Sequence, residues 1–319
     1  MEHSQREQRA GSVTRWLGRL VSAAGILVVG WILVTAWGAV VHGHPLYLVL
    51  LVVTLVGSAV GLWRSIARDR RRTGWRLAGW AALLTLAAGW IITLAWLRPF
   101  TAAEPALTAM ASDGAVTVAE TSSLIVMTPV GEAHGSGLFF QPGARVEARA
   151  YAAVLRPQAE AGHVVVIEKQ PLGIAFLSLG ALDDARSAAP DVNRWVVGGH
   201  SLGGTVAAMQ ADSDDDPASP VAGLLLYASY PAGDVSGSLD MPVLSLSADL
   251  DGLATPGKIQ ASQSDLPEDA DLQVIAGASH AQFGDYGTQP GDGIPTITDD
   301  AARAEIAAAT SRFLSDGLR

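Results

Sequence analysis

Hydrophobic positions divide the chain into two parts with different patterns. Residues 20–41, 46–63 and 77–97 are three predominantly apolar stretches without a charged residue. About 20 apolar residues, at a helical rise of about 1.5 Å each, are enough to cross the hydrocarbon core of a bilayer. A signal peptide has a shorter apolar core and does not explain three such stretches. The pattern therefore predicts three transmembrane helices within residues 1–100.

After residue 100, short β-rich stretches alternate with helical ones. The expected strands cover residues 123–127, 137–140, 163–167, 194–197, 221–227, 243–246 and 272–275, and the expected helices cover 146–161, 172–189, 202–211, 255–264 and 299–314. Several of the strands are continuously apolar, which is typical of parallel strands buried on both faces. This alternation predicts an α/β fold with a doubly wound, mostly parallel sheet in residues 122–319. Residues 101–121 are expected to be a linker with a first strand at 116–118.

Charge is distributed unevenly between the two parts. Residues 1–100 contain 11 of the 21 Lys and Arg residues and 3 of the 31 acidic ones, whereas the remainder contains 10 and 28. The arginines precede the first apolar stretch and separate the second from the third, while the loop at 42–45 has no formal charge. The positive-inside rule then predicts a cytoplasmic N-terminus, a lipid bilayer as partner, and an extracytoplasmic C-terminal domain. An acidic C-terminal part argues against nucleic acid as a partner.

Residue types exclude several kinds of site. The chain has no cysteine, which excludes disulfides, thiolate metal sites and a thiol nucleophile. His42 and His44 have no third metal ligand nearby in the sequence, and the acidic stretch at 212–216 lacks the glycine and the final ligand of a calcium-binding loop. The glycine-rich stretch at 284–293 lacks the lysine of a phosphate-binding loop. We therefore expect no metal and no organic cofactor.

One short motif lies where catalysis is expected. Residues 199–203 read Gly-His-Ser-Leu-Gly, and they follow an expected strand and precede an expected helix. In that context a Gly-x-Ser-x-Gly pattern predicts a nucleophile elbow, in which Ser201 is held exposed at the end of the strand. The free N–H groups and positive dipole end of the following helix favour developing negative charge, so the N–H of Leu202 is a candidate oxyanion donor.

A serine nucleophile needs a base, and the base needs an acid that orients it. His280 is the only histidine after Ser201. For the acid, Asp249 and Asp251 both follow the strand at 243–246, and Asp251 is preferred because it begins a turn that enters a helix. Asp249 remains the alternative, and Asp285 is less suited. For the second oxyanion donor we predict the N–H of Ala144, in the turn after the strand at 137–140.

With these motifs the sequence resembles the alpha/beta-hydrolase superfamily, and it is most similar to compact, lidless members of the dienelactone-hydrolase kind. The resemblance rests on residues 140–144, 199–204, 248–256 and 277–287, and it extends over 123–314. It implies a Ser201–His280–Asp251 triad and hydrolysis of an ester or related acyl bond in a small-molecule substrate. Dienelactone hydrolases use a cysteine nucleophile, which this chain lacks, and many relatives have His-Gly where this chain has Pro142-Gly143.

Two further hypotheses stay open at this point. One is transfer of the acyl group from the same triad to an acceptor other than water. The other is a non-catalytic membrane protein that uses a hydrolase-like domain for binding or scaffolding. The strong preference for arginine over lysine is typical of GC-rich bacterial genomes.

Overall fold

The computed structural model describes residues 2–67, 74–214 and 216–317. Contacts between residues divide the chain into two compact units. One unit holds the residues up to 98 except 42–44, and the other holds residues 42–44 and those from 99 onward.

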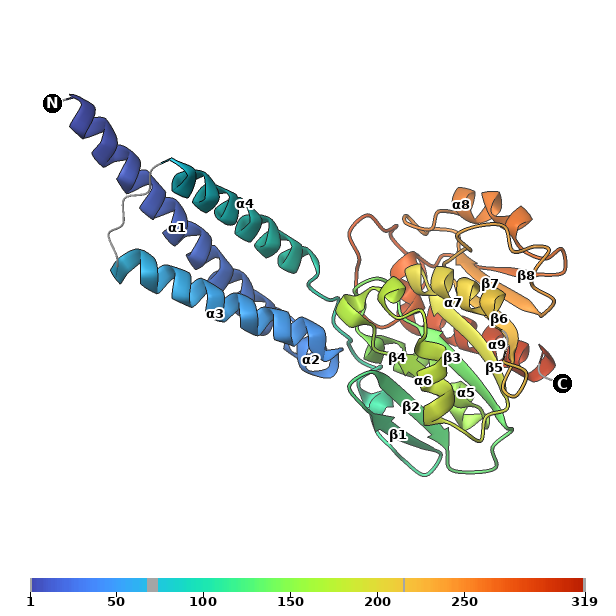
Figure 1. The fold of residues 1–319 in the computed structure, drawn as a ribbon. Helices are drawn as coiled ribbons and strands as arrows, with labels where there is room; N and C mark the ends of the chain where they lie inside the picture. Colours follow the sequence, from blue (N-terminus) through green and yellow to red (C-terminus); the bar gives the residue numbers. More distant parts are fainter. Residues whose placement is uncertain (1, 68–73, 215, 318–319) are drawn as a thin grey trace. The chain divides into compact units, whose positions relative to one another are not determined.

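The N-terminal unit is helical. It contains α1 (Glu2–Thr35), α2 (Trp37–His42), α3 (Pro45–Ala67) and α4 (Trp75–Trp96), and α1 contacts both α3 and α4 (Figure 1). Three segments are long and apolar enough to cross a membrane, namely Val13–Thr35, Pro45–Ala67 and Trp75–Trp96. The first helix differs from the expected range of 20–41, because it begins earlier and bends at Ala36. The N–H of Ala36 still bonds to Ile32, so the helical path continues into α2.

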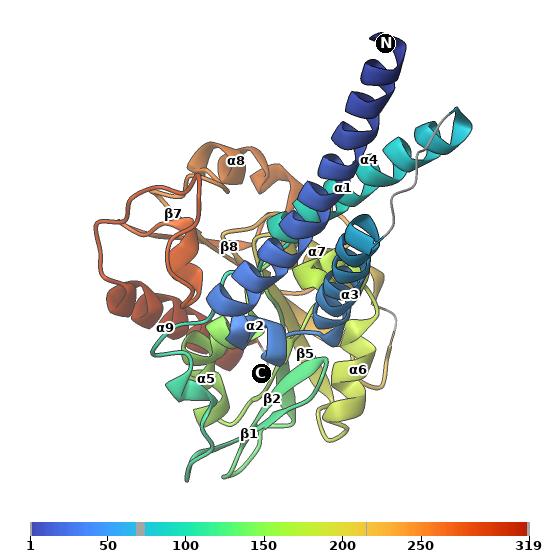
Figure 2. The ribbon, with the colours of Figure 1, turned by 90° about the vertical axis from the view of Figure 1, so that its left-hand side faces the viewer.

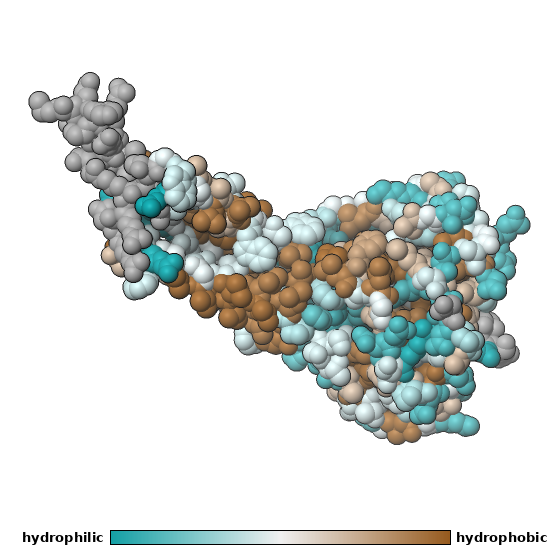
Figure 3. All heavy atoms as spheres, in the orientation of Figure 1, coloured by the Kyte–Doolittle hydropathy of each residue, from teal (hydrophilic) through white to brown (hydrophobic). Residues whose placement is uncertain are grey.

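Few side chains of this unit are packed inside it. Ile32, Leu51 and Leu94 are fully buried, whereas Val34 and Leu83 are 84% and 67% exposed. Figure 3 shows hydrophobic residues gathered over α3. Soluble proteins rarely expose apolar surface of this extent, and lipid chains accept it without cost. The three helices thus have the outward-facing apolar side chains of membrane-spanning segments.

The C-terminal unit is built on an eight-stranded sheet in the order β1-β2-β4-β3-β5-β6-β7-β8. The strands are β1 (Val116–Glu120), β2 (Leu124–Pro129), β3 (Ser136–Gln141), β4 (Val164–Glu168), β5 (Arg194–His200), β6 (Val221–Tyr227), β7 (Val243–Ala248) and β8 (Asp271–Ile275). The pairs β1–β2 and β2–β4 are antiparallel, and all other neighbours are parallel. The expected mostly parallel sheet is confirmed.

Helices cover both faces of this sheet (Figure 2). One face packs against α5 (Ala152–Glu160) and α9 (Asp299–Gly317), and the other packs against α6 (Ala181–Ala188) and α7 (Leu202–Ser213). Successive strand residues alternate between the two faces: Phe140 belongs to the first cluster and Phe139 to the second. This doubly wound arrangement explains why the strands are apolar at every position.

One expected helix is wrong over half of its length. Residues 172–189 form two single 3-10 turns, Pro171–Gly173 and Ala175–Leu177, and only then the short helix α6. Leu172 and Gly173 have φ values of 56° and 65°, in the left-handed region that ends an α-helix. The spacing of the apolar residues in this stretch is compatible with a continuous helix. That spacing carries no information on the left-handed backbone at residues 172–173, so the prediction was wrong there.

Candidate active site

The expected sharp turn is present between β5 and α7. Ser201 connects the two elements with φ 52° and ψ −123°, a conformation that a residue with a side chain adopts only under strain. Glycines make the turn possible. A Cβ on Gly199 would lie 2.4 Å from the carbonyl carbon of Gly203, and one on Gly204 would lie 2.6 Å from the Ser229 side chain. The strand and the helix therefore pass as closely as a nucleophile elbow requires.

The backbone of Ser201 is anchored on both sides of the turn. Its N–H donates to the carbonyl of Tyr227 at 2.9 Å, and its carbonyl accepts hydrogen bonds from the Ser229 hydroxyl at 2.6 Å and the Gly204 N–H at 3.0 Å. These bonds fix the strained residue to the end of the neighbouring strand β6. The side chain of Ser201, by contrast, makes no hydrogen bond within the described residues, and the residue is half-buried.

His280 and Asp251 form a buried pair. The Nδ1 of His280 donates to Oδ2 of Asp251 at 2.8 Å, and both side chains are almost completely inaccessible. The other oxygen of Asp251 accepts the N–H groups of Leu253 and Ala254 at 2.7 and 2.8 Å. With Nδ1 directed at a fixed carboxylate, Nε2 is the imidazole nitrogen that remains to accept a proton.

Strand order brings the three candidate residues to one rim of the sheet. Ser201 follows β5, Asp251 follows β7 and His280 follows β8, and these are parallel strands in the sequence of neighbours β5-β6-β7-β8. The carboxyl ends of parallel strands meet at the same edge of a sheet, where open α/β sheets bind their ligands.

The two alternative acids lie elsewhere. Asp249 accepts the N–H of Gly277 at 2.6 Å, and Asp285 pairs with Arg303 at 2.6 Å. Neither has a hydrogen bond to His280 among the described residues. The geometry therefore pairs Asp251 with the histidine.

The two candidate oxyanion donors lie in neighbouring segments, the start of α7 and the turn after β3. Leu202 is the first residue of α7, and Ala144 lies in the turn after β3. A Cβ on Gly203 would lie 2.1 Å from the carbonyl oxygen of Gln141, so the turn and the helix start are in van der Waals contact. Within the described part of the chain, neither the Leu202 nor the Ala144 N–H has a hydrogen-bond acceptor. Both are available to a ligand, as an oxyanion hole requires.

A buried hydrogen-bond chain supports the same turn from behind. The Tyr151 hydroxyl accepts the N–H of Gly143 at 2.9 Å and donates to Nδ1 of His200 at 2.7 Å. Burial and the neighbouring His280 hold the pKa of His200 well below its ordinary value, so this ring is neutral. Its centroid lies 4.5 Å from that of His280. Sequence reasoning saw His200 only as part of the serine motif and did not find the role of Tyr151.

Asp292 is the main residue that sequence reasoning missed. Its Oδ1 accepts the N–H groups of Gly252 and His280, both at 3.1 Å, and its Oδ2 accepts that of Ala281 at 2.9 Å. Burial raises the pKa of Asp292, but the N–H groups outweigh it and leave that pKa below its ordinary value. This carboxylate therefore ties the turn after Asp251 to the turn that holds His280. The only sequence signal was an acidic residue within the glycine-rich stretch at 284–293.

No group of three side chains able to ligate a metal occurs in residues 2–67, 74–214 and 216–317. The groups brought together at the candidate site are a hydroxyl, an imidazole, carboxylates and backbone N–H groups. This set of groups is suited to nucleophilic attack on a carbonyl carbon with general-base assistance.

A sequence model described as the alpha/beta hydrolase family matches residues 137–304, from β3 into α9. No curated protein matches the sequence significantly. Among solved structures, a CIB-like hydrolase from Thermoplasma acidophilum is 15% identical with a TM-score of 0.48, over 62% of this chain and 98% of that chain. A dienelactone hydrolase from Anabaena variabilis is 19% identical with a TM-score of 0.47, over 65% of this chain and 98% of that chain. Est1E from Butyrivibrio proteoclasticus is 14% identical with a TM-score of 0.47, over 64% of this chain and 99% of that chain.

Proposed function

Because the chain belongs to the alpha/beta hydrolase family, we propose that it is a membrane-anchored serine hydrolase that cleaves an ester or a related acyl bond. One observation carries the proposal. The buried hydrogen bond between Asp251 and His280 lies at the same rim of the sheet as the strained turn that presents Ser201. A strained, glycine-enclosed serine and an oriented imidazole at one site have no evident purpose in a merely structural domain.

The mechanism follows from the orientation of these groups. Ser201 Oγ attacks the substrate carbonyl carbon, and Nε2 of His280 takes the hydroxyl proton. Asp251 keeps the imidazole in the required tautomer and stabilises its charged form. The carbonyl oxygen becomes an oxyanion, which accepts hydrogen bonds from the N–H groups of Leu202 and Ala144.

The tetrahedral intermediate then expels the alcohol, which takes the proton from His280 and leaves an acyl-enzyme on Ser201. Water attacks this ester with His280 again as the base, and the acid product leaves. If an alcohol acceptor replaces water in this second step, the same residues perform acyl transfer. Product analysis with and without an added alcohol distinguishes the two reactions.

Labelling with a fluorophosphonate probe tests the nucleophile. We expect the purified full chain to be labelled, and the Ser201→Ala variant to lose labelling completely. Ser213→Ala is the matched control, because Ser213 lies exposed at the far end of the same helix α7 and should leave labelling unchanged. Persistent labelling of the Ser201→Ala protein would remove Ser201 as the nucleophile.

For the membrane part we propose three crossings, with the N-terminus in the cytoplasm and the hydrolase domain on the outer side. The three apolar helices and the arginines that flank them support this arrangement. An alkaline phosphatase fused after Arg319 is expected to be active, and a fluorescent protein that folds only in the cytoplasm is expected to be dark. The opposite pair of results would reverse the proposed orientation.

A further inference from the structure

An apolar loop lies at the same rim of the sheet as Ser201. Residues 170–180, which we call the rim loop, connect β4 to α6, and β4 runs parallel to β3 and β5. None of the loop residues is charged, although residues 101–319 contain 10 basic and 28 acidic ones. Three large apolar side chains of the loop are exposed, namely Phe176, Leu177 and Leu179. Neighbouring apolar side chains on a surface mark an interaction site, and the proposed catalytic mechanism uses none of these three.

The backbone of the rim loop holds these side chains on the surface. Two 3-10 turns fold the loop, and between its exposed and half-buried residues Ala175 is fully buried. The N–H of Leu177 donates to the carbonyl of Ile174 at 3.0 Å. The N–H of Ser178 donates to the carbonyl of Ala175 at 3.1 Å. Backbone N–H groups that are already paired cost little at an apolar boundary, so the loop is suited to contact with an apolar phase.

Hydrogen bonds connect the rim loop to the segment that follows the last apolar helix. The Gly173 carbonyl accepts the N–H of Arg145 at 2.7 Å, and the Arg145 carbonyl accepts the N–H of Phe100 at 2.8 Å. Phe100 comes four residues after Trp96, the last residue of α4. Four residues span at most about 14 Å. The length of the chain alone therefore keeps Phe100, and the loop bonded to it through Arg145, near the point where α4 ends.

Another exposed apolar side chain lies further along the same rim. Ile294 is 88% exposed, and it comes two residues after Asp292, whose carboxylate accepts the N–H of His280. The rim loop follows β4 and Ile294 follows β8, whereas Ser201 follows β5, which lies between these strands in the sheet. Exposed apolar side chains thus flank the proposed nucleophile on both sides along the rim.

We propose that the rim loop and Ile294 rest on the outer surface of the bilayer, and that the substrate is an ester carried by a membrane lipid. Exposed apolar side chains are stabilised at the boundary between lipid headgroups and acyl chains. Residues 101–319 are strongly acidic, so an anionic membrane surface repels most of this domain but not its uncharged loop. The contact rests on the three proposed crossings, and the substrate rests in addition on the proposed hydrolysis.

A fluorescent label on one residue tests the contact, because the chain has no cysteine of its own. Leu177→Cys carries an environment-sensitive fluorophore, and the full chain is reconstituted in phosphatidylcholine vesicles. We expect a blue-shifted emission that is quenched when the acyl chains of the lipid are brominated. Val130→Cys is the matched control, since Val130 is 54% exposed and Leu177 is 55% exposed. Val130 follows β2, which is antiparallel to β4, so it lies at the opposite end of the sheet and should show neither effect.

Three results would overturn the contact. Absence of quenching at Leu177 would mean that the loop stays in water, and equal quenching at Val130 would mean that no defined surface faces the lipid. A blue shift without quenching would mean that protein, such as a second copy of the chain, covers the loop. Flotation with the vesicles verifies insertion, and failure to float would remove the proposed crossings and the contact together. The labelled Ser201→Ala protein should be quenched equally, since the contact does not require hydrolysis.

Two esters test the lipid origin of the substrate. One is a fluorogenic diacylglycerol ester in vesicles, and the other is a water-soluble acetate ester. In the double variant Phe176→Asp/Leu177→Asp, activity on the first relative to the second should fall at least about tenfold, as for the loss of one buried apolar side chain. The control Val130→Asp/Leu272→Asp adds the same charge at exposed apolar positions away from the rim and should keep the wild-type ratio.

Two outcomes of this comparison would overturn a lipid substrate. An equal loss on both esters in Phe176→Asp/Leu177→Asp would assign the loop to the local fold or to the acyl site. An equal fall of the ratio in both double variants would reduce the effect to overall charge. If the wild type hydrolyses neither ester, the proposed function fails and the lipid substrate fails with it, whereas quenching at Leu177 still establishes the contact.

Discussion

At the scale of single residues, the two carboxylates near His280 are chemically alike and differ only in what they contact. Asp251 bonds to Nδ1 of His280, and Asp249 bonds to the backbone of Gly277. An asparagine in place of Asp251 has an amide that favours the wrong imidazole tautomer. An asparagine in place of Asp249 keeps an oxygen that accepts the same N–H.

We therefore expect Asp251→Asn to lower kcat about 10⁴-fold. Asp249→Asn should change kcat by no more than about twofold, as for a substitution outside the site. Hydrolysis of a chromogenic short-chain ester measures both. A large loss of kcat in Asp249→Asn, together with a normal kcat in Asp251→Asn, would make Asp249 the carboxylate that orients His280.

Glu168 is a second residue with an unusual environment. It is 2% exposed at the end of β4, and its Oε2 has no partner within the described ranges of the chain. Burial raises the pKa of Glu168 to about 8, with a smaller contribution from Asp184 and against the opposing influence of Ser178. The folded protein therefore holds a proton here that the unfolded chain releases near its ordinary pKa of 4.5.

Stability must then fall as the pH rises between these two values, because the folded state binds more protons than the unfolded state. The expected slope is about 1.4 kcal/mol per pH unit between pH 4.5 and 8. Thermal denaturation in detergent should show this slope in the wild type and not in Glu168→Gln. The exposed Glu305→Gln serves as the control, and a slope that survives in Glu168→Gln would assign it to another group.

At the scale of elements, the active site depends on how turns are held against each other. Asp292 accepts N–H groups from two turns that lie 28 residues apart, at Gly252 and His280. The pattern of apolar residues contains no trace of this contact, because it reports strands and helices and not the loops between them. For the same reason the sequence preferred Asp251 but left Asp249 as an alternative, since both follow the strand β7.

Asp292→Asn should lower kcat by about 10- to 100-fold with little change in KM, because its amide N–H₂ repels the Ala281 N–H and loosens the turn of His280. The lowered pKa of Asp292 means that its contribution to stability is present above pH 3.8 and is lost as the pH falls. The stability difference between wild type and variant should therefore shrink in acid. A constant difference across pH would contradict a role for the carboxylate charge.

The elbow also depends on the absence of side chains. Gly203→Ala would place a Cβ 2.1 Å from the Gln141 carbonyl oxygen, and backbone atoms there cannot rotate away. We expect a loss of about 1–3 kcal/mol in unfolding free energy, as for an overpacked core, and loss of fluorophosphonate labelling. Gly257→Ala, in α8 (Pro256–Ala261) with open space around it, is the matched control and should keep both. Normal labelling of Gly203→Ala would show that the two loops separate easily.

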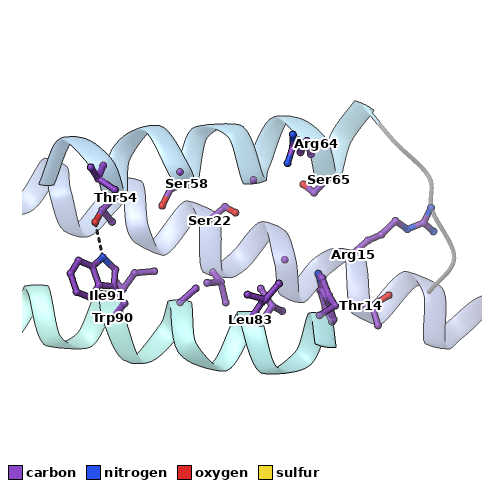
Figure 4. A pocket seen from close by; sticks show the side chains of 18 residues that line it. Thr14, Arg15, Ser22, Thr54, Ser58, Arg64, Ser65, Leu83, Trp90 and Ile91 are labelled. Atoms are coloured by element: carbon purple, nitrogen blue, oxygen red, sulfur yellow. Dashed lines mark hydrogen bonds between the residues drawn. The ribbon is translucent and has the colours of Figure 1, made fainter. Parts of the chain in front are cut away.

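At the scale of the whole molecule, the sequence predicted the two kinds of structure and their order because both rest on periodicity. Uncharged stretches of about 20 residues and alternating short strands are strong signals over many positions. The sequence did not predict the interruption of the expected helix at residues 172–173, because two residues with left-handed φ values are enough to end a helix. The structure also has a cavity between α1, α3 and α4 (Figure 4). The sequence did not predict it, because composition does not report how closely helices pack.

The three apolar helices predict how the full chain partitions. It should stay in the membrane pellet after extraction with alkaline carbonate and be released by detergent, since each of the three apolar spans is 22 or 23 residues long. Gel analysis of pellet and supernatant measures this. Release by carbonate alone would mean that the helices associate with each other in water and do not enter the bilayer.

The order of the strands has a consequence for biosynthesis. Ser201 precedes both of its proposed partners in the chain, and His280 follows the last strand of the sheet. A nascent polypeptide that has left the ribosome only as far as residue 250 contains Ser201 but lacks His280, the proposed base. Under the proposed mechanism, the catalytic groups are therefore complete only after His280 has been synthesised, when the three apolar helices have long left the ribosome. If the proposed triad is right, a ribosome that stalls before residue 280 releases a product without hydrolase activity.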